Sequence, residues 1–96
     1  MAHYRVRRYA AAPGYGVTFI EDTRERAVNS AMVQDQAEAA SMAALAILAD
    51  YLHGDSPRAW RLADAFEREF LSGDFTERAI DAGAVAQWIE LTERQR

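Results

Sequence analysis

The sequence predicts a single α+β domain over residues 1–96, with a small antiparallel sheet within residues 3–33 packed on three helices. The helices are expected at about residues 35–53, 57–72 and 82–93. Three observations support this fold class. The first third of the chain alternates apolar and polar residues around a Pro-Gly turn, the middle is rich in Ala, and two later segments carry apolar residues at helical spacing.

The Ala-rich segment Asp35–Leu52 is the predicted core helix. It contains seven Ala residues and no Gly or Pro, and Ala has the highest helix propensity. Its apolar residues fall on two faces, one with Met42, Leu45, Leu48, Ala49 and Leu52 and the other with Ala40, Ala44, Ile47 and Tyr51. Because a helix that is apolar on two sides is normally buried between other elements, this helix is expected at the centre of the core.

Two short strands joined by a turn are predicted before this helix. His3–Tyr9 alternates loosely between apolar and basic residues, and Tyr15–Ile20 alternates aromatic or branched residues with smaller ones. Pro13 presets its φ angle and Gly14 accepts a positive one, which is typical of a turn. Since an isolated hairpin is marginally stable in water, it must pack on the helices or gain a third strand.

The segment Glu21–Gln34 leaves more than one structure open. A helix could begin at Thr23, with Asp22 or Thr23 itself as its N-cap. Ala27–Val33 could equally be a third strand, with Val28 and Met32 as its apolar anchors. We favour a short strand or an irregular segment here.

The second helix has clear start and stop signals. Gly54 can end the core helix in a left-handed conformation, and Gly73 can close the second helix. Ser56 as N-cap with Pro57 at the first helical position is typical of a helix start. The expected apolar stripe consists of Ala59, Trp60, Ala63, Phe66 and Phe70.

The last helix is expected from about Ala82 to Glu93. Asp81 can cap it, and Phe75–Ile80 before it should be short and extended or irregular. Its apolar face has the spacing i, i+3, i+4, i+7 and consists of Val85, Trp88, Ile89 and Thr92.

Composition and charge exclude several classes of protein. The chain has no Cys, so it can form no disulfide framework and no thiolate metal site or nucleophile. No segment reaches the roughly 18 apolar residues of a membrane span, and we expect a cytoplasmic protein. All eleven cations are Arg; the first twelve residues carry +3 and the rest −7, which gives the net −4. A net negative charge disfavours general binding to nucleic acid and suits a basic partner.

The sequence supports no catalytic, cofactor-binding or metal-binding residue, and we predict that the protein is not an enzyme. Asp50, Tyr51, His53 and Asp55 cluster near the end of the core helix, where a metal or acid–base site could form. A His near a helix C-terminus interacts favourably with the last carbonyls, which explains the cluster without a site. Gly14–Gly16 lacks the Lys and the longer Gly pattern of a phosphate loop.

Two charged surfaces are the candidate binding sites. Arg5, Arg7 and Arg8 lie among aromatic residues and could contact phosphate, although exposed Arg is also ordinary protection of a strand edge. The acids could imitate a phosphate backbone and occupy a basic groove on a partner protein, although a charge run is usually a solvated face. The candidate partner-binding acids are Glu21, Asp22, Glu25, Asp35, Glu38, Asp64, Glu67, Asp74 and Glu77.

Ser41–Asp50, which reads SMAALAILAD, resembles the signature of a small family of unknown activity carried by phages, plasmids and other mobile elements. In that family the signature approximates Gly-Pro-Ala-Gln-Leu-Ala-Leu-Ala-Ile-Leu-Ala-Asp. Tyr4 with Arg5, the second helix, and Val85–Ile89 are similar to the family in order and spacing. The resemblance implies an amino-terminal strand pair and a mobile-element origin. The chain departs from the family at Ala39–Ser41, which replaces a Gly/Pro-rich entry, and at Met32–Gln36, where a Trp-Gly-Tyr segment has no counterpart.

These observations lead to one functional hypothesis and two alternatives. The hypothesis is a small non-enzymatic mobile-element protein that docks on a host protein, most concretely an inhibitor of bacterial defence of the anti-CRISPR type. It would cover a basic nucleic-acid-binding surface of a CRISPR interference complex, as a monomer or homodimer. The first alternative is a DNA- or nucleotide-binding accessory factor that uses the amino-terminal Arg strand. The second is a self-associating structural module with Trp60 or Trp88 at a dimer contact.

Overall fold

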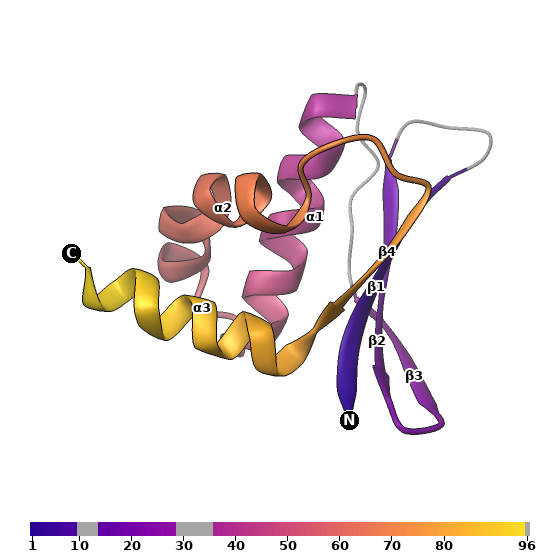
Figure 1. The fold of residues 1–96 in the computed structure, drawn as a ribbon, viewed down its shortest axis with the longest axis horizontal. Helices are drawn as coiled ribbons and strands as arrows, with labels where there is room; N and C mark the ends of the chain where they lie inside the picture. The colour runs from indigo at the N-terminus through magenta and orange to yellow at the C-terminus, as the bar shows by residue number, and fades with distance from the viewer. Residues whose placement is uncertain (10–13, 29–35, 96) are drawn as a thin grey trace.

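A four-stranded antiparallel sheet with helices on one face forms the protein, so the predicted α+β class is confirmed (Figure 1). The computed structural model describes residues 1–9, 14–28 and 36–95. In chain order the elements are β1 (Ala2–Arg8), β2 (Tyr15–Glu21), β3 (Arg24–Val28), α1 (Gln36–Tyr51), α2 (Ser56–Phe70), β4 (Glu77–Asp81) and α3 (Ala82–Arg94). The strands lie in the order β3-β2-β1-β4, and each neighbouring pair is antiparallel.

The Ala-rich helix α1 is the central helix of the fold, as predicted. It lies between the sheet and α2, while α3 lies below α1 and α2 in the view of Figure 1 and contacts β1 and β4. Ala43, Ala44, Ile47 and Leu48 are at most 1% exposed, so the middle of α1 is buried on both sides. Small Ala side chains let α2 approach the backbone of α1, which is consistent with close packing of the two helices.

The predicted hairpin is present as β1 and β2. Tyr4 pairs with Phe19 and Val6 with Val17, and the side chains of this row face the helices. Gly14 has a φ of 131°, a conformation that L side chains rarely adopt, while residues 10–13 lie outside the described residues.

The segment after β2 forms a strand, and the alternative helix beginning at Thr23 is wrong. Asp22 has a φ of 56° and makes the turn between β2 and β3 with Thr23, so it caps no helix. β3 then begins at Arg24, earlier than the predicted start at Ala27. Val28 is buried as expected, while Met32 lies outside the described residues.

The fourth strand, β4, corrects the prediction that the sheet lies within residues 3–33. Glu77–Asp81 pairs with β1, and Ile80 faces Tyr4 on the helix side of the sheet. Its alternation was weak because Ile80 is the sole buried residue of the strand. A strand with one apolar anchor is defined by its long-range pairing rather than by its own pattern.

Two details of the second helix differ from prediction. Asp55, not Ser56, is the N-cap, because its carboxylate accepts a hydrogen bond from the Arg58 backbone N–H at 3.3 Å. The buried stripe consists of Ala59, Leu62, Ala63 and Phe66. Trp60 lies to the side of this stripe and is 67% exposed, so its predicted place in the apolar stripe is wrong.

Asp81 caps α3 as predicted, since its Oδ2 accepts a hydrogen bond from the Ala84 backbone N–H at 3.0 Å. We expect Asp81→Ala to lower the free energy of unfolding by about 1 kcal/mol, because a helix donor loses its partner. Asp81→Asn keeps the acceptor and serves as the control in urea denaturation followed by circular dichroism. Equal losses in the two variants would show that the cap does not stabilise the protein.

Candidate functional site

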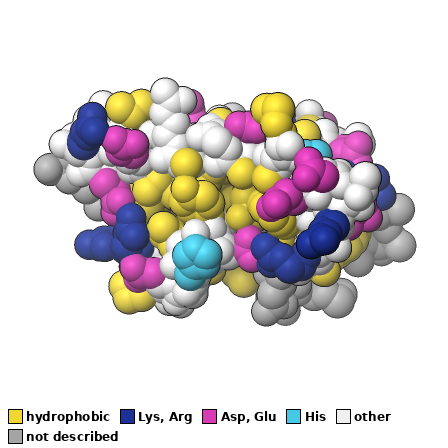
Figure 2. Space-filling model, turned by 90° about the horizontal axis from the view of Figure 1, so that it is seen from below, with side chains coloured by type: hydrophobic (Ala, Val, Ile, Leu, Met, Phe, Trp, Pro, Cys, Tyr) yellow, Lys and Arg dark blue, Asp and Glu magenta, His cyan; other side chains and the backbone are white. Residues whose placement is uncertain are grey.

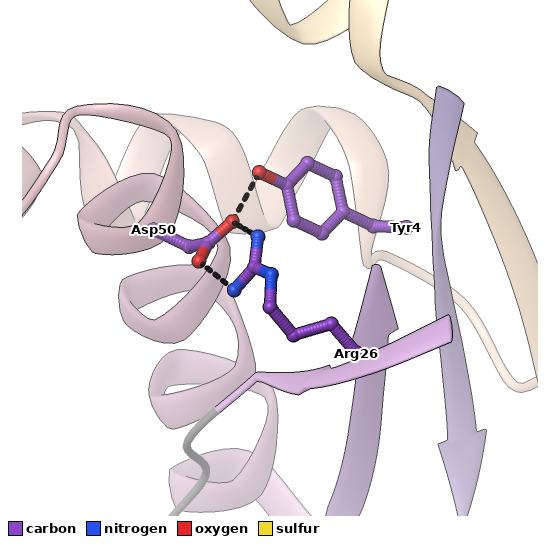
Figure 3. Close-up of polar contacts among 3 residues, drawn as sticks. All are labelled: Tyr4, Arg26 and Asp50. Carbon is purple, nitrogen blue, oxygen red and sulfur yellow. Dashed lines mark hydrogen bonds and ion pairs between the residues drawn. The ribbon is translucent and has the colours of Figure 1, made fainter. Parts of the chain in front are cut away.

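Three side chains from three elements meet at the C-terminal end of α1 (Figure 3). Arg26 of β3 donates to both carboxylate oxygens of Asp50, with Nη1–Oδ1 at 2.6 Å and Nη2–Oδ2 at 3.0 Å. Tyr4 of β1 donates its hydroxyl to Asp50 Oδ2 at 2.8 Å. We call Tyr4, Arg26 and Asp50 the Asp50 cluster.

Strand periodicity and the position of α1 bring the Asp50 cluster together. Tyr4 and Arg26 both lie on the helix-facing side of the sheet, on either side of β2, where Phe19 lies between them. The Phe19 ring is 5.0 Å from the Tyr4 ring centroid and 5.0 Å from the Arg26 guanidinium carbon. The cluster therefore ties the edge strand β3 and the inner strand β1 to α1.

The electrostatics of the Asp50 cluster fit a structural role. The bidentate bond from Arg26 is the main cause that holds the pKa of Asp50 below its usual range, and the bond from Tyr4 adds to it against the effect of burial. Burial is the main cause that raises the pKa of Tyr4 far above its usual value. Both pKa values move away from neutrality, whereas an acid–base catalyst at pH 7 needs a pKa near 7.

Two hollows flank the Arg26–Asp50 ion pair. One, of about 570 Å³, lies between β3 and α1 and is lined by Arg26, Val28, Ala46, Ala49, Asp50, His53 and Gly54. We call it the β3–α1 groove. The other, of about 530 Å³, is lined by Tyr4, Phe19, Arg26, Asp50, Tyr51, Leu52, His53, Arg58 and Ala82. Figure 2 views the end of the molecule where the N-terminus lies and shows apolar side chains in the middle, with charges of both signs around them.

The residues of the possible metal or acid–base site near the end of α1 do not converge: two of them make separate hydrogen bonds and one is exposed. Asp50 belongs to the Asp50 cluster, Asp55 caps α2, and His53 is exposed in the turn with a φ of 54°. Within residues 1–9, 14–28 and 36–95, no group of three or more His, Asp and Glu side chains is placed to hold a metal ion.

An apolar groove lies between α1 and α2 beside Trp60. It has a volume of about 220 Å³ and is lined by Met42, Leu45, Ala46, Ala49, Ser56, Ala59 and Trp60. We call it the Trp60 groove. No charged side chain lines it, and Trp60 presents most of its surface to solvent at its rim. Large exposed aromatic side chains beside such hollows are typical of protein–protein contacts.

The three arginines of the predicted phosphate contact do not form one patch. Alternation along β1 places Arg5 and Arg7 on the face of the sheet away from the helices and Arg8 on the opposite face. Each faces an acid: Arg5 pairs with Glu25 at 3.6 Å, Arg7 with Glu77 at 2.7 Å and Arg8 with Asp74 at 2.8 Å. These pairs reduce the positive charge available to a phosphate.

The predicted partner-binding acids also fall into separate groups. Those with a partner inside the chain are Asp22 with the N-terminal amine, Glu67 with the Ser41 hydroxyl, and Glu25, Asp74 and Glu77 with the arginines of β1. Glu21 and Asp64 are exposed and have no ion-pair partner among the described residues. The side chains of Asp35 and Glu38 lie outside the described part of the structure.

The protein is thus an α+β protein with helices on one face of its sheet. Its surface has a polar cluster at the end of α1 and an apolar groove between α1 and α2. Comparisons with protein-family models, with curated proteins and with solved structures find no match to this chain. Among the described residues, no helix has the length and apolar character needed to cross a membrane.

Proposed function

We propose that this protein is a non-enzymatic binding protein that docks on another protein through the Trp60 groove. The observation that supports this most strongly is the 67% exposure of Trp60 beside an uncharged hollow. The core does not need this side chain, because the buried stripe of α2 is complete without it. Trp is among the residues that contribute most to binding when a partner covers them.

The surroundings of the groove favour a partner with a basic surface around an apolar anchor. Asp64 lies one helical turn after Trp60 on α2, and it is exposed without an ion-pair partner among the described residues. A cation on the partner could therefore pair with Asp64 while an apolar side chain fills the groove. The net charge of −4 would steer a basic partner towards the protein.

The narrowest form of the proposal is a mobile-element protein that inhibits bacterial defence, of the anti-CRISPR type. It would cover a basic nucleic-acid-binding surface of a CRISPR interference complex. The net negative charge and the resemblance around Ser41–Asp50 support this form. A purified interference complex mixed with the protein should then lose binding of its target DNA, and cells that produce the protein should show more phage plaques. Unchanged DNA binding and plaque counts would contradict the anti-CRISPR proposal. They would not bear on docking through the Trp60 groove, which is tested separately below.

The general proposal is tested by replacing Trp60. We expect Trp60→Ala to weaken binding to the partner by about 30-fold or more, the effect of losing a central aromatic contact. Leu91→Ala is the matched control, because Leu91 of α3 is also a large exposed apolar residue, 49% exposed, away from the groove. Binding should be measured with tagged wild type and both variants in pull-downs, followed by titration of the captured partner. Equal capture by all three proteins would contradict the proposal.

A further inference from the structure

The outer edge of β3 is a strand edge with a groove beside it. β3 lies at one end of the strand order and pairs with β2 alone among the described residues. On the helix side, Arg26 and Val28 of this strand line the β3–α1 groove together with residues of α1, and Arg26 is bonded to Asp50. An unpaired edge offers backbone N–H and C=O groups that only another extended chain can pair in register.

Ion pairs inside the chain engage two of the three charged side chains of β3, Arg26 with Asp50 and Glu25 with Arg5. Charged side chains on an edge strand normally block the addition of another strand. Here the guanidinium of Arg26 is turned onto α1, where Asp50 holds it by two hydrogen bonds. Its charge is neutralised, and its side chain lines the β3–α1 groove.

Alternation along β3 defines what an added strand must carry. Arg24, Arg26 and Val28 share the helix-facing row, since they pair with Glu21, Phe19 and Val17 of the same row in β2. A residue opposite Val28 would lie beside the apolar lining residues Val28, Ala46 and Ala49, which favours an apolar side chain. Arg24 is exposed and has no ion-pair partner among the described residues, so the residue opposite it should be acidic.

We infer that the β3 edge binds an extended segment of a partner protein as a fifth strand, with an apolar residue at the Val28 end and an acidic residue at the Arg24 end. This inference does not depend on the Trp60 groove. A second copy of the chain fits less well, because antiparallel pairing of β3 with itself over its full length places Arg24 opposite Val28 and supplies no acid opposite Arg24.

A synthetic peptide can test the inference. The probe is a capped peptide whose central residues are, in order, valine, threonine, alanine, threonine and glutamate, which places valine opposite Val28 and glutamate opposite Arg24 in an antiparallel pair. Titrated into the labelled protein, it should give saturable shifts of the backbone amide signals of β3 in NMR spectra. Arg24→Glu should weaken its affinity at least about fivefold, because an opposite-charge pair becomes a like-charge pair.

Two controls separate strand addition from other contacts. Arg68→Glu changes the net charge by the same amount on the exposed face of α2 and should leave the affinity unchanged. A peptide with two adjacent prolines at its centre loses backbone donors and should not bind. The inference is overturned if the β3 amides do not shift, if the proline peptide binds equally well, or if wild type and both variants bind the probe alike. It is also overturned if dilution alone shifts the β3 amides, since a second copy would then occupy the edge.

Discussion

Phe66→Ala is expected to lower the free energy of unfolding by about 3–5 kcal/mol, the largest effect of any substitution considered for this protein. Phe66 is fully buried in α2 and packs against two further rings. Its ring centroid is 4.6 Å from that of Phe70 and 5.4 Å from that of Trp88, which it meets edge-on. Since these rings join α2 to α3, truncation would leave a cavity between the two helices. A chain of this size is stabilised by about 5–14 kcal/mol in total, so a large fraction of its stability would be lost.

The control for this prediction is an aromatic residue of the same helix in the opposite environment. Trp60→Ala removes a larger side chain, yet it should change the free energy of unfolding by no more than about 0.5 kcal/mol, because Trp60 is mostly exposed. Both variants can be measured by urea denaturation followed by circular dichroism. A loss in Trp60→Ala as large as in Phe66→Ala would show that Trp60 packs against the domain, and the Trp60 groove would then not be a free surface.

Asp50→Ala is expected to lower the free energy of unfolding by about 2 kcal/mol at pH 7. The substitution removes the shared acceptor of Arg26 and Tyr4, and it leaves the largely buried Tyr4 hydroxyl without its partner. The free energy of unfolding can be measured by urea denaturation of wild type and variant. Glu90→Ala is the control, because Glu90 forms an exposed ion pair with Arg94 within α3, and such pairs contribute little. Similar losses in both variants would contradict a stabilising role for the Asp50 cluster.

The same variant should remove part of the pH dependence of stability. Because Arg26 holds the pKa of Asp50 lower in the folded chain than in the unfolded chain, the ionised carboxylate contributes its full stabilisation above the unfolded pKa, about 3.9. That contribution is lost as the pH falls through the folded pKa. The difference in free energy of unfolding between wild type and Asp50→Ala should therefore be constant from pH 5 to 7 and shrink below about pH 4. A difference that stays constant down to pH 2 would contradict the lowered pKa.

Local patterns in the sequence were enough to predict most of the fold. The Ala-rich segment of α1, the turn signals at Gly54 and Gly73, and the cap at Asp81 act over a few residues, and the structure contains each of them. β4 escaped prediction because its place depends on pairing with β1, which is distant in sequence. Trp60 was misplaced because helical spacing alone does not give the edge of a buried stripe.

The Asp50 cluster shows which part of the surface could not be predicted. The sequence groups Asp50 with nearby polar residues at the end of the helix, but its partners Tyr4 and Arg26 come from two strands that are remote in the chain. The alternation of β1 places Tyr4 on the helix side, which was a usable signal. Arg26 gives no such signal, since the local pattern of Glu21–Gln34 is compatible with more than one structure. Similarly, the ion pairs that engage Arg7 and Arg8 follow from the position of β4 and the turn before it.

The pairing of β1 with β4 has a consequence for how the chain folds during its synthesis. His3 pairs with Asp81, so one neighbour of this inner strand emerges from the ribosome long after the other. Until β4 is made, one side of β1 in the nascent chain has no strand to pair with. Bringing β4 back to β1 closes a loop formed by most of the chain, and the entropy lost in that step is offset only by the interactions of the completed sheet. The sheet can therefore be completed only when most of the polypeptide has been translated, and a chain terminated before Glu77 would leave β1 as an unpaired edge strand that could pair with other chains.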